Sequence, residues 1–175
     1  MGKKLGRLFF LFILIGGTLW GDAVRIGLSK STASLYGEFQ IGLKPIYGRV
    51  LGLYVKDGEN WGGVGFMTQG PFIGYPNLNV SLFVDGVHSR NRNALPIGVG
   101  FNYMMPYAFL PLSIRGEFEY ANNLLTFGDA TRFSRGEFQL GVQIIENGEL
   151  FLGYRTIRWD TPFKSNWYLG VGFVW

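Results

Sequence analysis

Hydrophobic and polar residues alternate with a period of two through most of the chain after residue 23. The clearest segment covers residues 110–120, where apolar side chains occupy the even positions and most odd positions are polar or charged. Side chains on a β-strand point alternately to its two faces, so this pattern predicts a strand with one apolar and one charged face. No window sustains the helical spacing of apolar residues over three turns. The same alternation recurs over residues 34–43, 78–87, 95–105, 134–144 and 149–157.

Ten strands are predicted in total, with eight as the fallback. Three segments with weaker faces, whose sidedness the pattern leaves open, and a final strand over 166–175 complete the set; the weaker segments are 23–30, 47–56 and 61–69. The connections alternate between short turns and longer polar stretches, as they do in membrane barrels. The short turns contain Lys44-Pro45, Met105-Pro106 and Glu146-Asn147-Gly148, and the longer connections are 88–94, 121–132 and 158–165.

The polar faces distinguish a membrane barrel from a soluble β-sandwich, which also alternates. A sandwich exposes its second face to water, where Lys, Glu, Thr and Ser predominate, whereas these faces mix glycines with charges of both signs. Small residues and paired charges suit a narrow enclosed lumen. A closed barrel also leaves no backbone donor unpaired in hydrocarbon. We therefore predict an all-β fold, a closed antiparallel transmembrane β-barrel of about ten strands over residues 24–175.

The charged residues on the polar faces are the candidate site. Opposite charges enclosed together should pair, because an unpaired charge in a poorly hydrated interior costs several kcal/mol. A salt-bridge network that stiffens the lumen is the simpler interpretation, and a small polar passage or solute site is the functional one. The predicted lumenal network consists of Glu38, Asp85, Arg115, Glu117, Glu119, Arg135, Glu137 and Arg155.

The last strand carries the sharpest local signal. Its aromatic and aliphatic residues alternate with Tyr168, Gly170 and Gly172, and the sequence ends on an aromatic residue. This pattern resembles the terminal strand that the outer-membrane barrel assembly machinery reads, so that machinery is an expected partner. The predicted insertion face consists of Trp167, Leu169, Val171, Phe173 and Trp175.

Residues 1–23 have the order of a secretory signal peptide: basic residues, then an apolar run, then small residues. The run from Leu8 to Trp20 spans about 13 residues, short of the roughly 18 to 20 that a membrane-spanning helix needs. We expect cleavage after Ala23, with cleavage after Gly21 as the alternative and an uncleaved anchor as the less favoured interpretation.

Without that segment, 16 Lys plus Arg become 13 and 12 acids become 11, so the formal charge falls from +4 to +2. No basic stripe remains to neutralise a row of phosphates, so a nucleic-acid partner is not expected. The absence of Cys excludes disulfides, thiolate metal sites and a Cys nucleophile. We expect no metal, no cofactor and a monomer.

Three segments of the chain carry a family resemblance: Gly116-Glu117-Phe118-Glu119-Tyr120, Gly153-Tyr154-Arg155-Thr156-Ile157 and Tyr168-Leu169-Gly170-Val171. They look like the YfaZ family of small outer-membrane proteins, and the likeness is best from about residue 95 onward. Relatives carry a strongly acidic loop, which here is only Asp57-Gly58-Glu59-Asn60, and the last residue is Trp rather than Phe. The resemblance implies an outer-membrane barrel and no established activity, so it transfers no functional residue.

His88 and Ser89 raise an enzymatic alternative, since some small outer-membrane barrels deacylate lipid A with His, Ser and Glu. Those enzymes share a His-x-Ser-Asn arrangement, whereas here His88 and Ser89 are adjacent and should point to opposite faces. We therefore expect no catalytic residues. Arg90 and Arg92 in the following loop offer contacts to the phosphates of lipopolysaccharide.

The sequence thus predicts an integral protein of the cell outer membrane, with a narrow pore for small polar solutes as one role. A soluble periplasmic β-barrel binding protein is the competing class. Outer-membrane lipids and lipopolysaccharide are the expected surroundings. Seven aromatic residues near strand ends are candidates for the two interfacial girdles: Tyr47, Trp61, Tyr103, Tyr107, Tyr120, Trp159 and Trp167.

Overall fold

The computed structural model describes residues 21–42, 45–56, 58–105, 111–160 and 164–174, which form twelve strands. Within these ranges, no helix is long and apolar enough to cross a membrane. The strands are β1 (Gly21–Leu28), β2 (Thr32–Gln40), β3 (Ile46–Val55), β4 (Trp61–Phe72), β5 (Tyr75–Ser89), β6 (Arg92–Ala94), β7 (Ile97–Met105), β8 (Leu112–Ala121), β9 (Thr126–Gly128), β10 (Phe133–Ile145), β11 (Gly148–Trp159) and β12 (Lys164–Val174).

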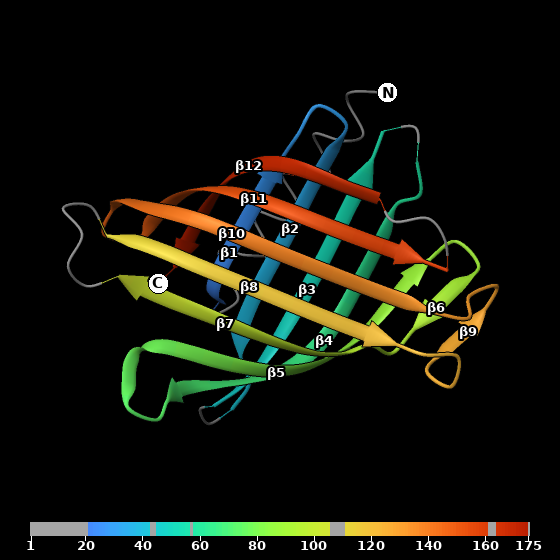
Figure 1. The fold of residues 1–175 in the computed structure, drawn as a ribbon, viewed down its shortest axis with the longest axis horizontal. Helices are drawn as coiled ribbons and strands as arrows, with labels where there is room; N and C mark the ends of the chain where they lie inside the picture. Colours follow the sequence, from blue (N-terminus) through green and yellow to red (C-terminus); the bar gives the residue numbers. More distant parts are fainter. Residues whose placement is uncertain (1–20, 43–44, 57, 106–110, 161–163, 175) are drawn as a thin grey trace.

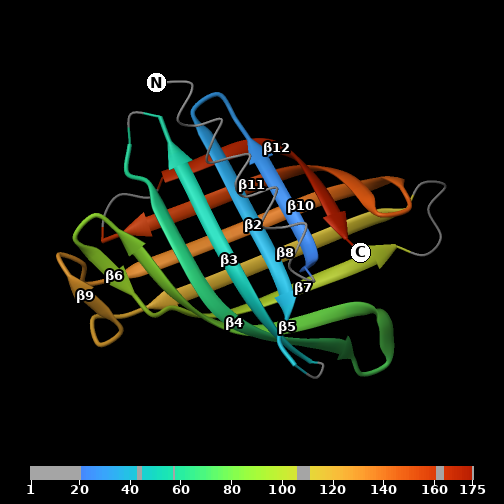
Figure 2. The same ribbon diagram turned by 180° about the vertical axis from the view of Figure 1, so that it is seen from behind.

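Ten of these strands form one closed antiparallel barrel (Figures 1 and 2). The sheet runs β4-β3-β2-β1-β12-β11-β10-β8-β7-β5, and pairing of β4 with β5 completes the ring. The first and last strands are neighbours, with Ile26 opposite Val171. Every barrel strand therefore pairs on both sides, and the predicted closed barrel of ten strands is confirmed.

The two ends of the barrel differ. The end at which β1 begins and β12 ends, here called the terminal end, also holds the two-residue turns 73–74 and 146–147. Gly74 adopts φ of 83° in the first of these, a conformation that favours glycine. The opposite end, here called the loop end, holds the long connections 90–96 and 122–132. The predicted short turn at 146–148 and the predicted long loops near 88–94 and 121–132 agree with these connections, whereas the short connection 29–31 also lies at the loop end.

Strands β6 and β9 were not predicted and lie outside the barrel. They are three residues each within two connections that the sequence marks as loops, and they pair with each other at the loop end (Figure 1). Asp160 fixes a third connection there: it accepts hydrogen bonds from the Thr131 hydroxyl and from the backbone N–H groups of Thr131 and Arg132. Burial would raise the pKa of the Asp160 carboxyl, but these hydrogen bonds outweigh it and hold the pKa below its usual value.

Candidate functional site: a charged lumen closed by an aromatic cluster

The distribution of burial in this barrel is the reverse of that in a soluble protein. Arg49 and Asp85 are 0% exposed inside the barrel, whereas Phe66 is 65% and Leu169 67% exposed on its outer face. This follows from strand parity, because odd-numbered residues of β5, β8, β10 and β11 point inward and even-numbered ones point outward. Between the rims of the two ends, no outward-facing residue among those described carries a charge. The apolar and charged faces predicted for these four strands are therefore assigned correctly.

Arg135 on β10 is the centre of the lumenal network. Its guanidinium contacts three carboxylates, Glu119 at 2.7 Å, Glu117 at 2.9 Å and Glu137 at 3.1 Å. The register places Arg135 directly opposite Glu119 on β8, with Glu117 opposite Glu137 two residues along. Cross-strand neighbours on one face lie within reach of each other's side chains. Strand pairing itself thus assembles this cluster.

The cluster extends to both sides. Arg155 on β11, opposite Glu137, contacts it at 2.9 Å, and the Tyr168 hydroxyl donates a hydrogen bond to the same carboxylate. Across the lumen, Arg49 on β3 contacts Glu117 at 2.9 Å and Asp85 at 3.3 Å. Five adjacent or facing strands are therefore connected through charged side chains.

A second set of ion pairs lies nearer the terminal end. Arg25 on β1 contacts Glu38 at 3.4 Å and Glu149 at 3.2 Å, and the Tyr36 hydroxyl donates to Glu38 at 2.6 Å. Arg115 is the most loosely held lumenal arginine, with its nearest carboxylate, that of Glu38, at 4.0 Å. All eight residues predicted for the lumenal network thus lie in the lumen and participate in ion pairs.

Sequence reasoning missed three members of the network: Arg25, Arg49 and Glu149. Arg25 and Arg49 lie on the segments whose sidedness could not be assigned, although Arg25 does sit between two apolar neighbours. Glu149 precedes Leu150 and Leu152, and parity alone would have placed it on the polar face. Together with the eight predicted residues, the described lumen holds five arginines and six carboxylates.

Lumenal glycines make room for aromatic rings that cover the guanidinium groups. The Arg49 guanidinium carbon lies 3.8 Å from the ring centre of Phe83, and a Cβ on Gly98 would overlap that ring. Likewise Arg155 lies 4.5 Å from the centre of Tyr168, whose ring occupies the space of a Cβ on Gly153. The face of an aromatic ring attracts a guanidinium placed over it, most strongly where both are desolvated. These glycines therefore serve the close packing that the sequence led us to expect.

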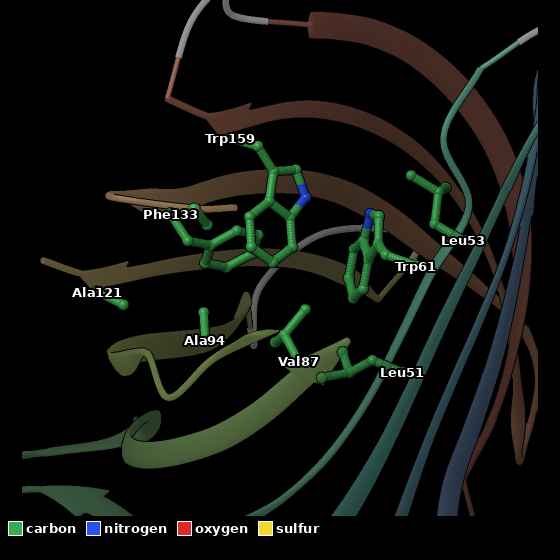
Figure 3. Packing of buried hydrophobic residues seen from close by; sticks show 9 residues of the cluster. Leu51, Leu53, Trp61, Val87, Ala94, Ala121, Phe133 and Trp159 are labelled. Atoms are coloured by element: carbon green, nitrogen blue, oxygen red, sulfur yellow. The ribbon is translucent and has the colours of Figure 1, made fainter. Parts of the chain in front are cut away.

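An apolar cluster fills the lumen at the loop end (Figure 3). Its centre is Phe133, which is fully buried and lies between Trp159, at a centroid distance of 4.6 Å, and Trp61, at 6.4 Å. Smaller residues from β6 and the 122–132 connection complete it, so the outlying strand β6 helps to cap the barrel. The cluster consists of Leu51, Leu53, Trp61, Val87, Ala94, Ala121, Ala130, Phe133 and Trp159.

This cluster corrects part of the girdle prediction. Trp61 and Trp159 are 7% and 8% exposed within the lumen, and Tyr47 is also buried there, so none of the three can contact an interface from outside. Strand-end position alone was misleading, because these residues lie on inward positions. Tyr120 and Trp167 do lie exposed on the outer face, and Tyr107 falls outside the described residues.

Two small spaces adjoin the charged network. One cavity of about 30 Å³ is lined by Tyr36, Trp61, Arg115, Arg135 and Gln139 among others. A second cavity, of about 20 Å³, lies between Gln69, Asn79, Asn102 and Arg115. A space that holds one water needs roughly 10 to 15 Å³. Neither cavity therefore accommodates more than about two water molecules.

His88 and Ser89 do not form a nucleophile–base pair. His88 lies on the outer face, where its Nδ1 is 2.8 Å from Oδ1 of Asn93. Ser89 is buried on the inner face and donates a hydrogen bond to the Asn60 carbonyl at 2.6 Å. As adjacent strand residues they point in opposite directions, which was the expectation. In the described ranges, no group of three or more His, Asp or Glu side chains could hold a metal ion.

The last strand presents the predicted apolar face. Trp167, Leu169 and Phe173 are exposed on the outer surface, and Val171 lies in the same row with lower exposure. Strand β12 is hydrogen-bonded to β11 and β1, so its edges are satisfied within the barrel. Trp175 lies outside the described residues, as does most of the predicted signal segment.

The chain matches no protein-family model, no curated protein and no solved structure. The resemblance to the YfaZ family stays a prediction, and the function has to be inferred from the geometry of the barrel.

Proposed function

We propose that the protein is an integral outer-membrane β-barrel whose lumen is closed and whose role is structural. The observation that carries the proposal is the inverted burial: fully buried Arg49 and Asp85 inside, and a wall of exposed Val, Leu and Phe outside. Soluble monomers rarely expose contiguous apolar patches larger than a few hundred Å². Lipid is the solvent that makes such a wall favourable, and a closed barrel satisfies its backbone there.

The proposal includes an orientation. Both described ends of the chain, at Gly21 and Val174, lie at one end of the barrel. In bacterial barrels with an even number of strands, that end faces the periplasm and the longer loops face outward. The loop end, with β6 and β9, therefore faces the cell exterior. Outer-membrane lipids, including lipopolysaccharide, surround the wall, and the assembly machinery engages β12.

A closed lumen favours the structural role over the pore. The ionic network joins strands around the barrel, and the aromatic cluster fills its loop end. A polar passage would need these ion pairs to separate, and separating buried ion pairs costs several kcal/mol per charge. The lipid-hydrolase alternative has no support from His88 and Ser89, which lie on opposite faces.

Membrane fractionation with gel electrophoresis tests the proposal. The expressed protein should stay in the pellet after carbonate extraction, because its wall is integrated in lipid. Extracted without heating, it should migrate faster on a denaturing gel than after boiling, because a closed barrel resists detergent.

Release into the carbonate supernatant would instead support the soluble periplasmic class. Insertion of the purified protein into planar bilayers separates the two membrane roles. A closed lumen gives no discrete conductance steps across voltage and salt, and stepwise conductance would replace the structural role with a pore.

A further inference from the structure

Outside the lumen, charge is segregated along the barrel axis. Every described Lys or Arg that is not in the lumen lies at the loop end, together with three described acids, Glu59, Asp129 and Asp160. At the terminal end, the described residues outside the lumen supply only two acids, Asp22 and Glu146. The basic residues of the loop end are Lys30, Lys56, Arg90, Arg92, Arg132, Arg158 and Lys164.

Three of these residues, Lys30, Lys56 and Lys164, gather around the turn between β1 and β2 and are called here the lysine cluster. Lys30 is in the turn, and the backbone N–H of Lys56 donates to the Ser31 carbonyl of the same turn at 2.8 Å. Lys164 begins β12, the neighbour of β1. Its Nζ lies close to Gly58, two residues after Lys56, at 4.0 Å from the position that a Cβ on that glycine would occupy. All three lysines are exposed.

The lysine cluster has no carboxylate partner among the described residues, whereas two of the rim arginines have oxygen partners. Arg92 pairs with Glu59 at 3.4 Å, and Arg158 donates to the Asp160 carbonyl at 2.6 Å. No described carboxylate lies within 4.0 Å of the lysine ammonium groups. Asp57, which follows Lys56 in the sequence, is outside the described residues. The cluster therefore presents three exposed cations at the loop-end rim where β12, β1 and β2 meet, with Lys164 on the inward row of β12 opposite Ile157.

We propose that the lysine cluster binds the phosphate groups of lipid headgroups in the leaflet at the loop end. This inference rests on the proposed function, because it places the apolar wall below the cluster in that leaflet. Cations immediately beside a membrane-spanning wall lie at the height of the headgroups, and each contributes to the attraction of anionic lipid. Charge complementarity thus identifies the occupant as an anionic, phosphate-bearing lipid. The site differs from the Arg90 and Arg92 loop, where Glu59 already satisfies Arg92.

Lipid binding in neutral detergent micelles tests this site by native mass spectrometry. Wild-type protein should retain phosphatidic acid at lower concentrations than phosphatidylcholine, and added salt should weaken the preference. In the triple variant Lys30→Gln, Lys56→Gln and Lys164→Gln, the concentration for half-saturation by phosphatidic acid should rise at least about tenfold. The comparison variant, Arg90→Gln, Arg92→Gln and Arg132→Gln, removes the same charge from the other part of the rim and should raise that concentration by less than the lysine variant does.

Three results would overturn the inference: equal retention of the two lipids by wild type, equal losses in both triple variants, or displacement of phosphatidic acid by inorganic phosphate, which would indicate a site for the free ion. Carbonate extraction of the wild type tests the proposed function separately. If the protein stays in the membrane but does not select phosphatidic acid, only the proposed lipid site is wrong. If carbonate releases the protein, the membrane assignment itself is wrong.

Discussion

Replacing Arg135 by Met should lower the free energy of unfolding by about 3 to 5 kcal/mol. Arg135 is the shared partner of Glu117, Glu119 and Glu137, and its loss leaves the buried Glu119 without an arginine among the described residues, while Glu117 and Glu137 keep Arg49 and Arg155. Met keeps an apolar stem but lacks the guanidinium, so the substitution removes the ion pairs, their hydrogen bonds and the contact of the guanidinium with Trp61 together. Denaturant titration of the folded barrel in lipid vesicles measures the loss.

Arg132→Met provides the matched control, because Arg132 lies exposed on the rim three residues away. Its substitution should change stability by less than about 0.5 kcal/mol. The double variant Arg135→Met and Glu119→Gln should be more stable than Arg135→Met alone, since it removes the carboxylate charge that Arg135 had paired. Equal effects of the two Met substitutions would contradict the central place of Arg135 in the network.

Replacing Leu140 by Arg should cost about 2 to 4 kcal/mol in folding into lipid. Leu140 is exposed on the outer face near the middle of β10, between Leu152 and Ile114 on the adjoining strands. A guanidinium there would lie near the centre of the hydrocarbon. The penalty is measured by unfolding of the variant in vesicles relative to the wild type.

Two further substitutions distinguish the effect of the strand face from the effect of depth in the membrane. Gln139→Arg should cost much less, because Gln139 faces the lumen and donates to Glu137 at 2.9 Å. Leu112→Arg should have an intermediate effect, since Leu112 is the first residue of β8 and lies near the terminal rim. Equal penalties at all three positions would show that parity does not separate a lipid face from a lumen.

The sequence predicted the fold well where the two faces of a strand differ most. On β8 and β10, the inward residues Arg115, Glu117, Glu119, Arg135 and Glu137 alternate with outward residues that are apolar or glycine, so the inward residues were assigned correctly. On β3 the inward row runs Tyr47, Arg49, Leu51 and Leu53, because it passes from the ionic network into the aromatic cluster. Both faces of β3 are therefore partly apolar, and alternation could not assign them.

The alternation of apolar and polar residues could not predict the contacts within the lumen. Which carboxylate meets Arg49 depends on the closure that brings β3 opposite β8, and alternation within a strand carries no information about facing strands. The aromatic cluster was missed for a related reason: Phe133 and Trp159 face each other only in the observed register. Strands β6 and β9 are too short to show a period of two.

A single-cysteine scan over residues 138–143, in neutral lipid vesicles, tests most directly whether the apolar wall contacts lipid. The wild-type chain has no cysteine, so each variant carries one nitroxide label, whose collisions with oxygen and with a water-soluble nickel chelate are measured. A wall in contact with lipid should give a period of two: labels at 138, 140 and 142 collide with oxygen as freely as lipid-exposed groups do, and those at 139, 141 and 143 are shielded from it. Collision of the even-numbered labels with the nickel chelate, or the absence of that period, would contradict contact of the wall with lipid.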